Sequence, residues 1–379
     1  MFIERFRNQL TSQKAQGLYR NPRAIDARRG KYLTSEGKTR LSFAGNDYLG
    51  LAQSPEFSAR VARNFEKYGT SSSSSRLVTG NFALLNEAEQ AFSEYFGYDD
   101  ALFFPSGYQC NLGVLSTLFR PEDTVFYDKH IHASSVKGIV LSGAVPRGFN
   151  HNSTTHLERR LKSSDAPQLP VVTESLFSMD GDFLDVSGLE QLKARQELFC
   201  VVDEAHAFGA LGPGGRGIAR EVADVAVGTL GKAMALFGAF VLMPKGIKEY
   251  LMNFSSPLIY STTLPEAHAA SCLDLLTVLE RADSEREKLA RISRCMKDRL
   301  TEKGFTVGGD AHILAVTMGD ETRAVRVAQR LYENGILAFP ARFPTVPLGQ
   351  AILRVGMTAC HDGSDVDLFV EKLVDADKE

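Results

Sequence analysis

The residues of this chain that could do chemistry stand directly after short apolar runs. Lys232 is the one lysine in the apolar, glycine-spotted run DVAVGTLGKAMALFGAFVL, residues 224–242. Lysine is rarely buried without a partner. Apolar surroundings lower the pKa of its amine, which frees the amine as nucleophile and base. Asp203 ends the run LFCVVD, and His206 follows three residues later. An amine, a carboxylate and an imidazole in these places indicate a single polar site.

A third apolar run, ALFFP, is followed by Ser106, Gly107 and Tyr108, which open a predicted helix. The N–H groups at a helix N-terminus bind phosphate, and ligands of parallel sheets lie outside the carboxyl ends of the strands. Pyridoxal 5′-phosphate (PLP) uses a phosphate cradle, an acid, an imidazole and an amine together, and its ring is an electron sink. The joint order of these residues predicts a PLP enzyme. Singly, a surface lysine, a capping aspartate and satisfied histidines are the more ordinary interpretations.

Apolar runs alternate with helical stretches along the chain, and these elements must position the site. The runs are ALFFPSG, DTVFYD, LPVVTESLF, LFCVVDEAH, VAVGTL, AFVLMP and LIYSTT. Because they are continuously apolar, we expect strands covered on both faces, hence a mainly parallel sheet in an α/β domain. A long helix over about 265–303 leads into a smaller α+β segment, which contains HILAVTMGD and AILRVGMTA as strands. The predicted parts are an N-terminal arm (1–45), a large PLP-binding domain (46–280) and a small C-terminal domain (281–379).

Composition excludes several other classes of protein. A net charge of −3 over 379 residues gives no reason to expect a nucleic-acid or membrane-surface partner. The five cysteines are scattered and form no C-x-x-C pair, which favours a reducing cytoplasm over a disulfide framework or a structural zinc site. The charged N-terminus MFIERFRNQL is no signal peptide, and no run of 18 apolar residues predicts a membrane span.

Three short motifs imitate other functions. GPGGRG (212–217) matches a dinucleotide fingerprint, but the preceding strand ends too far upstream, near Asp203. DEAH (203–206) is similar to a helicase box, yet the chain lacks the phosphate-binding loop that helicases need. HIH (130–132) has no third ligand at a recognisable spacing, so no metal site is expected.

Eight segments together resemble one family. They are SFAGNDYLGL, PSGYQCN, IHAS, TESLFSMDGD, VVDEAHAFGALGPGGRG, GTLGKA, IYSTTLP and FPTVPLGQAILRVGMTACH. Nearly the whole chain resembles the α-oxoamine synthases, which are fold-type I PLP enzymes. The resemblance implies an acyltransferase that condenses an amino acid, first of all L-alanine, with an acyl thioester and releases CO₂. The acyl donor implied is a pimeloyl thioester of CoA or of an acyl carrier protein, and the active unit implied is a cytoplasmic homodimer.

The resemblance also implies roles for single residues. The catalytic residues implied are Lys232, His132, Asp203 and His206. The cofactor-binding residues implied are Ser106, Gly107, Tyr108, Gln109, His132, Glu174, Ser178, Asp203, His206, Thr229, Lys232 and Thr262. The substrate-binding residues implied are Arg20, Asn46, Tyr48, Thr345 and Arg354. In this scheme Lys232 binds the PLP aldehyde, Thr262 reaches the neighbouring subunit's phosphate, and Arg354 clamps the amino-acid carboxylate.

Four positions depart from the family pattern. The serine run 71–75 replaces a glycine-rich turn, and Ala235 replaces a usual glycine; a Cβ makes positive-φ backbone more costly at such places. Leu85 stands where histidine is common, and Ile352 where an arginine is common. We interpret the serine run as an ordered turn rather than a disordered linker.

Several other functions stay open from the sequence. Within the family they are glycine C-acetyltransferase, 5-aminolevulinate synthase and serine palmitoyltransferase, which use related chemistry on other substrates. Outside it, a PLP aminotransferase would turn over 2-oxoacids without releasing CO₂. A scaffold with a relic site would bind no PLP at all.

Overall fold

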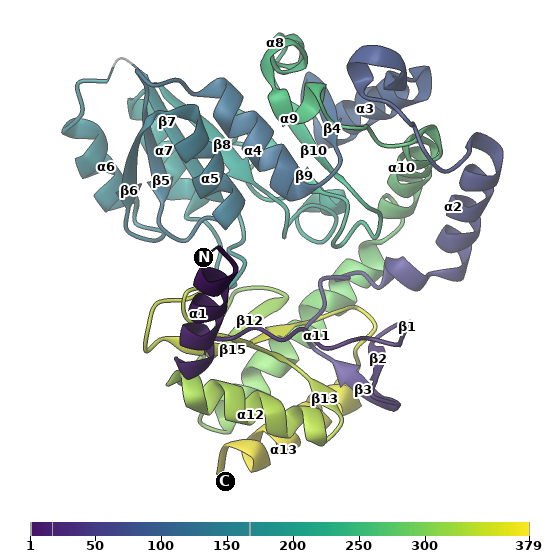
Figure 1. Ribbon diagram of the computed structural model, residues 1–379, viewed down its shortest axis with the longest axis vertical. Helices are drawn as coiled ribbons and strands as arrows, with labels where there is room; N and C mark the ends of the chain where they lie inside the picture. Colours follow the sequence, from purple (N-terminus) through teal and green to yellow (C-terminus); the bar gives the residue numbers. More distant parts are fainter. Residues whose placement is uncertain (1, 17, 167, 379) are drawn as a thin grey trace.

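The computed structural model describes residues 2–16, 18–166 and 168–378 (Figure 1). Within these ranges, seven strands form a large sheet in the order β4-β10-β9-β8-β7-β5-β6. The strands are β4 (Asp100–Phe104), β5 (Thr124–Asp128), β6 (Val145–Phe149), β7 (Leu169–Glu174), β8 (Leu198–Asp203), β9 (Val225–Thr229) and β10 (Ala239–Met243). β10 is antiparallel to β4 and β9, whereas the pairings among β5 to β9 are parallel. The predicted mainly parallel sheet is confirmed.

Alternate residues of the large sheet enter two separate apolar clusters. Phe126 and Val202 belong to one cluster, and their neighbours Val125 and Val201 belong to the other. The sheet is therefore buried on both faces, which explains why its strands read as continuous apolar runs. The helices over one face are α4 (Gly107–Leu118), α5 (Ala133–Ser142), α8 (Ile247–Phe254) and α9 (Ser256–Ile259). Those over the other are α3 (Ala83–Phe96), α6 (Thr154–Lys162) and α7 (Val186–Arg195).

The C-terminal part lies below the large sheet in Figure 1 and carries a second sheet. In the described chain this C-terminal sheet has the order β11-β12-β15-β14. Its strands are β11 (Val307–Gly308), β12 (Ile313–Gly319), β14 (Phe339–Ala341) and β15 (Ala351–Gly356), and the helices around it are α11 (Asp283–Glu302), α12 (Glu321–Glu333) and α13 (Gly363–Lys378). The predicted strands HILAVTMGD and AILRVGMTA are thus adjacent partners, β12 and β15.

The N-terminal residues join the C-terminal part through a third sheet. Strands β1 (Ala27–Arg29), β2 (Tyr32–Ser35) and β3 (Lys38–Ser42) form a meander, and β3 pairs in parallel with β13 (Ile336–Leu337). The remaining elements are α1 (Phe2–Ala15), a 3₁₀ turn (Leu51–Gln53), α2 (Pro55–Tyr68), a π-helical turn (Arg76–Gly80), a second 3₁₀ turn (Pro213–Gly215) and α10 (Glu266–Leu279). The domain boundaries at 45 and 280 stay a prediction.

Two expectations about elements are wrong. The run LIYSTT is no strand: it spans the end of α9 and a single bridge between Thr262 and Ser75. The helix expected over 265–303 is two helices, because α10 ends at Leu279 and α11 starts at Asp283. None of the described helices is long and apolar enough to cross a membrane.

Candidate active site

A cavity of about 210 Å³ opens where β7, β8 and β9 end and α4 begins. Carboxyl ends of neighbouring parallel strands meet at one edge of a sheet, so the residues that follow them converge there. The predicted site residues that line this cavity are Gly107, Tyr108, His132, Glu174, Ser178, Asp203, His206, Thr229 and Lys232. The structure therefore brings together residues from five separate segments, as the order of motifs predicts.

Lys232 and His206 lie side by side in the centre of the cavity, next to Tyr48. Lys232 Nζ lies 2.8 Å from His206 Nε2, and His206 Nδ1 lies 2.6 Å from the Tyr48 hydroxyl. Burial lowers the pKa of Lys232 to about 8. Burial and the neighbouring Lys232 charge hold the pKa of His206 well below its usual range. The histidine is neutral, and its Nε2 can accept a hydrogen bond from the amine.

The tautomer of His206 follows from the tyrosine. The Tyr48 hydroxyl donates to Asn46 Oδ1 at 3.0 Å, and Arg354 Nη2 donates to the same oxygen at 3.2 Å. Since the Tyr48 proton is used there, the hydroxyl oxygen accepts from His206 Nδ1–H. Nε2 is then the acceptor that faces Lys232. The predicted substrate residues Asn46, Tyr48 and Arg354 thus form one connected network with the predicted catalytic pair.

Asp203, the last residue of β8, presents a carboxylate that is held from two sides. Its Oδ1 accepts the Ala205 N–H at 2.9 Å, and its Oδ2 accepts Asn111 Nδ2 at 2.8 Å. The two hydrogen bonds fix the orientation of the carboxylate at the cavity wall. Such a group can pair with a cationic ring nitrogen.

His132 stands at the N-terminus of α5 as a neutral ring. Its backbone N–H donates to Glu174 Oε1 at 2.5 Å, and its Nδ1 lies 2.6 Å from the Ser134 hydroxyl and 3.3 Å from the Ser134 N–H. Nδ1 is therefore the acceptor and the proton is on Nε2. Burial lowers the pKa of His132, and burial together with the nearby Asp203 charge raises the pKa of Glu174 well above its usual range.

The opposite end of the cavity suits an anion. Ser106 caps α4 by accepting the Gln109 N–H at 3.3 Å, and the Gln109 side chain turns away to donate to Pro257 O and Ser261 Oγ. A Cβ at Gly107 would lie 3.7 Å from Thr229 Oγ1, so the helix start and the threonine hydroxyl are close neighbours. Backbone N–H groups of a first helical turn beside a hydroxyl form a phosphate site.

Arg354 reaches this region from the C-terminal part, on β15. It is almost fully buried. Its Nε donates to the Ser178 carbonyl at 2.7 Å, in the loop after β7. The candidate site is thus built jointly by the large sheet and the C-terminal sheet.

Besides Ser106, Gln109, Asn46, Tyr48 and Arg354, which lie outside the cavity lining but are placed above by their contacts, three predicted residues outside the lining are exposed. They are Arg20, Thr345 and Thr262. Thr262 forms a bridge with Ser75, at the end of the serine run. The roles of these three residues stay predictions.

Three polar residues were missed by the sequence interpretation. Asn111 donates to Asp203, and Ser134 bonds to His132. His312 Nε2 donates to the His206 carbonyl at 3.1 Å, and its ring lies against Tyr48. Asn111 had a usable signal, because it lies one helical turn after Gly107 and so faces the same way. No such signal in the sequence points to His312, because it lies directly before β12, in the C-terminal sheet, far along the chain from the other site residues.

The departures from the family pattern coincide with backbone strain at two places. Ser73, in the middle of the serine run, has φ +50°, and Ala235 has φ +56°. Both are left-handed conformations that favour glycine. Leu85 is fully buried in the core, and Ile352 lies in β15 opposite Thr317 and Ala341.

Comparisons with known proteins agree with this geometry. The sequence pattern of "Aminotransferase class I and II" matches residues 38–373. An 8-amino-7-oxononanoate synthase of Chlorobaculum parvum is 37% identical, over 95% of this chain and 93% of its own length. A lysine-to-alanine variant of serine palmitoyltransferase from S. paucimobilis, solved with a bound PLP–myriocin aldimine, matches with a TM-score of 0.92 at 27% identity, over 98% of this chain and 96% of its own. An 8-amino-7-oxononanoate synthase structure from Francisella tularensis has a TM-score of 0.78 at 30% identity, over 89% and 98%. The predicted family resemblance and the fold-type I architecture are confirmed.

Proposed function

The chain belongs to the aminotransferase class I and II family and, within it, to the α-oxoamine synthase group, and on that premise we propose that it catalyses the 8-amino-7-oxononanoate synthase reaction. L-alanine and a pimeloyl thioester would give 8-amino-7-oxononanoate, CO₂ and the free thiol. The observation that carries the proposal is the half-buried Lys232, whose amine is held 2.8 Å from a neutral His206 in a cavity walled by Asp203. The 37% identity to the Chlorobaculum enzyme favours alanine and a pimeloyl group.

The residues of the cavity fit PLP. The first turn of α4 and Thr229 suit its phosphate, the Asp203 carboxylate suits its ring nitrogen, and the flat His132 ring stands where it can stack. Lys232 would hold its aldehyde carbon, and His206 its ring oxygen. When bound, PLP supplies an electron sink for the bond-breaking at the amino acid's α-carbon.

The chain's own residues account for the remaining steps. The Lys232 amine, with its pKa near 8, removes the α-proton of alanine and later returns a proton to the product. The buried Arg354 guanidinium binds the alanine carboxylate and orients the α-carbon over Lys232. In the overall reaction a carbon–carbon bond forms between that α-carbon and the acyl carbonyl, the thiol leaves, and the alanine carboxylate departs as CO₂.

The active unit proposed is a homodimer in which Thr262 completes the partner's phosphate site. The exposed apolar side chains of Leu77, Val78 and Tyr260 support it, because they lie on two segments in contact, the π-helical turn and the end of α9. Such a concentration of apolar surface is typical of an interface. Sedimentation equilibrium of the purified protein tests the mass of the unit.

The substrate assignment is tested by product mass. The protein loaded with PLP is incubated with L-alanine and pimeloyl-CoA or the pimeloyl carrier protein. Parallel reactions contain glycine with acetyl-CoA and L-serine with palmitoyl-CoA; the serine arm is included because of the likeness to serine palmitoyltransferase. We expect the alanine–pimeloyl product to dominate, with one CO₂ per product. Preferential turnover in another arm would reassign the substrates and leave the family intact.

A further inference from the structure

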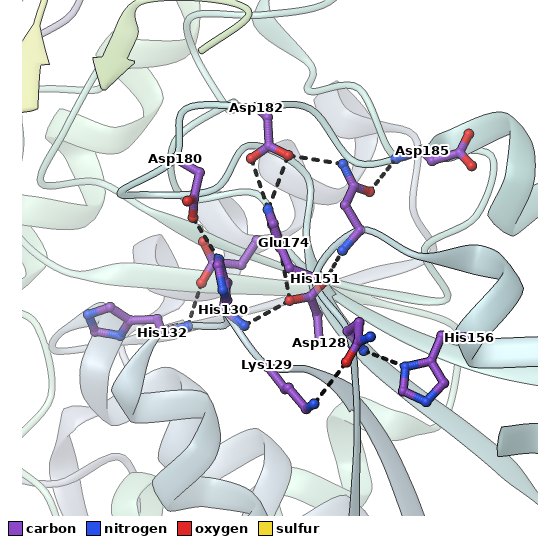
Figure 2. A network of polar contacts seen from close by, with 12 residues as sticks. Asp128, Lys129, His130, His132, His151, His156, Glu174, Asp180, Asp182 and Asp185 are labelled. Carbon is purple, nitrogen blue, oxygen red and sulfur yellow. Dashed lines mark hydrogen bonds and ion pairs between the residues drawn. The ribbon is translucent and has the colours of Figure 1, made fainter. Parts of the chain in front are cut away.

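Beside the cavity, a histidine after β6 is held between two carboxylates (Figure 2). His151 Nδ1 lies 3.1 Å from Asp128 Oδ1, at the end of β5, and His151 Nε2 lies 3.1 Å from Asp182 Oδ2, in the loop after β7. Asp128 is fully buried and Asp182 is partly buried. The three loops meet because β5 lies between β6 and β7 in the large sheet. Nothing in the sequence motifs assigns a role to this residue.

Both ring nitrogens of His151 must carry protons to serve two carboxylates, so the ring is an imidazolium. Burial alone would lower the pKa of His151, but the hydrogen bonds and charges of Asp128 and Asp182 outweigh it and raise the pKa to about 10. The other ionisable groups that face it are His130, stacked on its ring at 4.0 Å, and Asp180, which lies 2.9 Å from His130 Nδ1.

The same cluster does not suit a metal ion. His130, His151 and Asp180 place one ligand atom each within 4.8 Å of one another. However, the two imidazoles are nearly parallel, with 9° between their planes. A metal binds in the plane of each imidazole, and stacked rings do not direct their lone pairs to a common point. Both His151 nitrogens are also used by carboxylates. The arrangement is a charge clamp rather than a coordination site.

His151 holds both ends of a closed turn. The Phe177 N–H donates to the Asp182 carbonyl at 3.1 Å, and the Gly181 N–H donates to the Phe177 carbonyl at 2.9 Å. The Phe177 ring meets the His151 ring edge to face, 4.4 Å between centroids. One end of the turn is thus packed on the imidazolium, and the other end is bonded to it through Asp182.

The turn carries the carbonyl that orients Arg354. Ser178 follows Phe177, and its carbonyl accepts Arg354 Nε at 2.7 Å. On its other side the turn is pressed against β12, because Gly181 has φ +71° and a Cβ there would lie 2.1 Å from the Ile313 carbonyl. The turn is therefore fixed from one side by the imidazolium and from the other by the sheet that carries Arg354.

We propose that His151 is a positioning residue for the amino-acid substrate: by holding both ends of the 177–182 turn, it keeps the Ser178 carbonyl where it aims the Arg354 guanidinium. The inference rests on the carboxylate-binding role proposed for Arg354 above. His151 lies outside the residues that line the cofactor cavity. Its loss should weaken binding of the amino acid and leave PLP binding nearly unchanged.

The test compares the PLP-loaded wild type with His151→Leu, Asp182→Asn and the double variant. Asp182→Asn keeps the shape of the side chain and removes its charge, so it reports even if His151→Leu folds poorly. Asp377→Asn breaks the Arg323 ion pair on α13 and serves as the matched control. Dissociation constants for L-alanine, glycine and L-serine are measured from the change in cofactor absorbance, alongside PLP affinity, KM and kcat.

We expect amino-acid Kd and KM to rise about 10-fold in Asp182→Asn and more in His151→Leu, a loss typical of one charged hydrogen bond. PLP affinity and kcat should change less than about 3-fold, and the control should match the wild type. The double variant should be no worse than His151→Leu, because the two residues act through one contact. Unchanged amino-acid Kd with lower thermal stability, or an equal loss of PLP affinity, would overturn the proposal.

A second readout needs no substrate. In ¹⁵N-histidine spectra of the protein without PLP, both nitrogens of His151 should be protonated at pH 8, and a neutral ring would contradict the clamp. The proposed function fails separately, if the wild type makes no product from alanine and a pimeloyl thioester while the amino-acid Kd still shifts in the variants. If none of the three amino acids binds the wild type, the role of Arg354 fails and this inference with it.

Discussion

Two histidines lie at the same edge of the large sheet, but one has cationic neighbours and the other lies between two carboxylates. His206 contacts the Lys232 amine and the Tyr48 hydroxyl, and its pKa is lowered far below the usual range by burial and by Lys232 and Arg354. His151 lies between Asp128 and Asp182, and its pKa is raised to about 10. Burial acts in the same direction on both rings, so the sign of the neighbouring charge decides the outcome.

The difference separates a reactive region from a supporting one. At Lys232 the surroundings disfavour charge, so a neutral imidazole faces an amine that loses its proton near neutral pH. At His151 the two neighbouring carboxylates stabilise the protonated ring, so it stays cationic and acts as a fixed clamp. A catalytic group has to change protonation during the reaction, whereas a clamp serves best when it does not.

The largest effect is expected from removing the amine of the reactive region. Lys232→Ala should lower turnover by about 10⁴-fold or more, because the variant loses both the cofactor-binding amine and the group that moves the α-proton. Borohydride reduction followed by peptide mass mapping should place the pyridoxyl label on residue 232 of the wild type and nowhere in the variant. Lys372→Ala, on the surface of α13, is the control. Turnover within 10-fold of the wild type would remove Lys232 from the mechanism.

How far the sequence predicts these two regions depends on how the contacts are made. Asp203 and Thr229 are the last residues of β8 and β9, so strand-end reasoning finds them directly. The contact between His151 and Asp182, by contrast, depends on β5 lying between β6 and β7. A local apolar pattern predicts where a strand ends but not which strands are neighbours in the sheet. The residues of the reactive region could therefore be predicted from the sequence, whereas the contacts of His151 could not.

The same limit explains the two wrong elements. LIYSTT has a strand-like composition, but the short helix α9 begins at Ser256, has Pro257 in its first turn and takes in the first two residues of the run; Thr262 is left with a single bridge. The break between α10 and α11 falls at Glu280–Ala282, where local composition continues to favour helix. In both places contacts with distant segments determine the backbone conformation, and a local sequence pattern does not reveal those contacts.

The next largest expected effect is a pH dependence of PLP capture by Lys232, which distinguishes the reactive region from the region around His151. The Lys232 amine has a lowered pKa of about 8 in the protein without PLP. Only the neutral amine attacks an aldehyde, so the rate of covalent PLP capture should rise about 10-fold per pH unit below 8 and level off above it. Stopped-flow absorbance between pH 6 and 10 measures the rate. If the capture rate kept rising up to pH 10, the pKa of Lys232 would be that of an ordinary lysine, and the contrast with His151 would be lost.

A smaller effect concerns stability at His151. Its pKa is higher in the folded protein, about 10, than the usual 6.5, so the proton stabilises the folded state fully below pH 6.5 and progressively less as pH rises to 10. The difference in unfolding free energy between wild type and His151→Leu should therefore shrink by about 1 kcal/mol over that interval, since partial exposure screens the ion pairs. Urea titrations at pH 6, 8 and 10 measure it. A constant difference would mean that packing alone holds this ring.

The smallest expected effect concerns the turn beside each of the two regions. Gly181, in the turn beside His151, has φ +71°, whereas Ala235, in the turn just after Lys232, has φ +56° and carries a Cβ. Its N–H donates to the Lys232 carbonyl at 3.0 Å, so the strain lies directly behind the reactive amine. Ala235→Gly should stabilise the protein by roughly 0.5–1 kcal/mol, because relief of left-handed strain exceeds the entropy cost of glycine. Urea unfolding measures the gain, and the lysine titration near pH 8 should not move. A loss of stability would show that the half-buried Ala235 methyl contributes more by packing than it costs in strain.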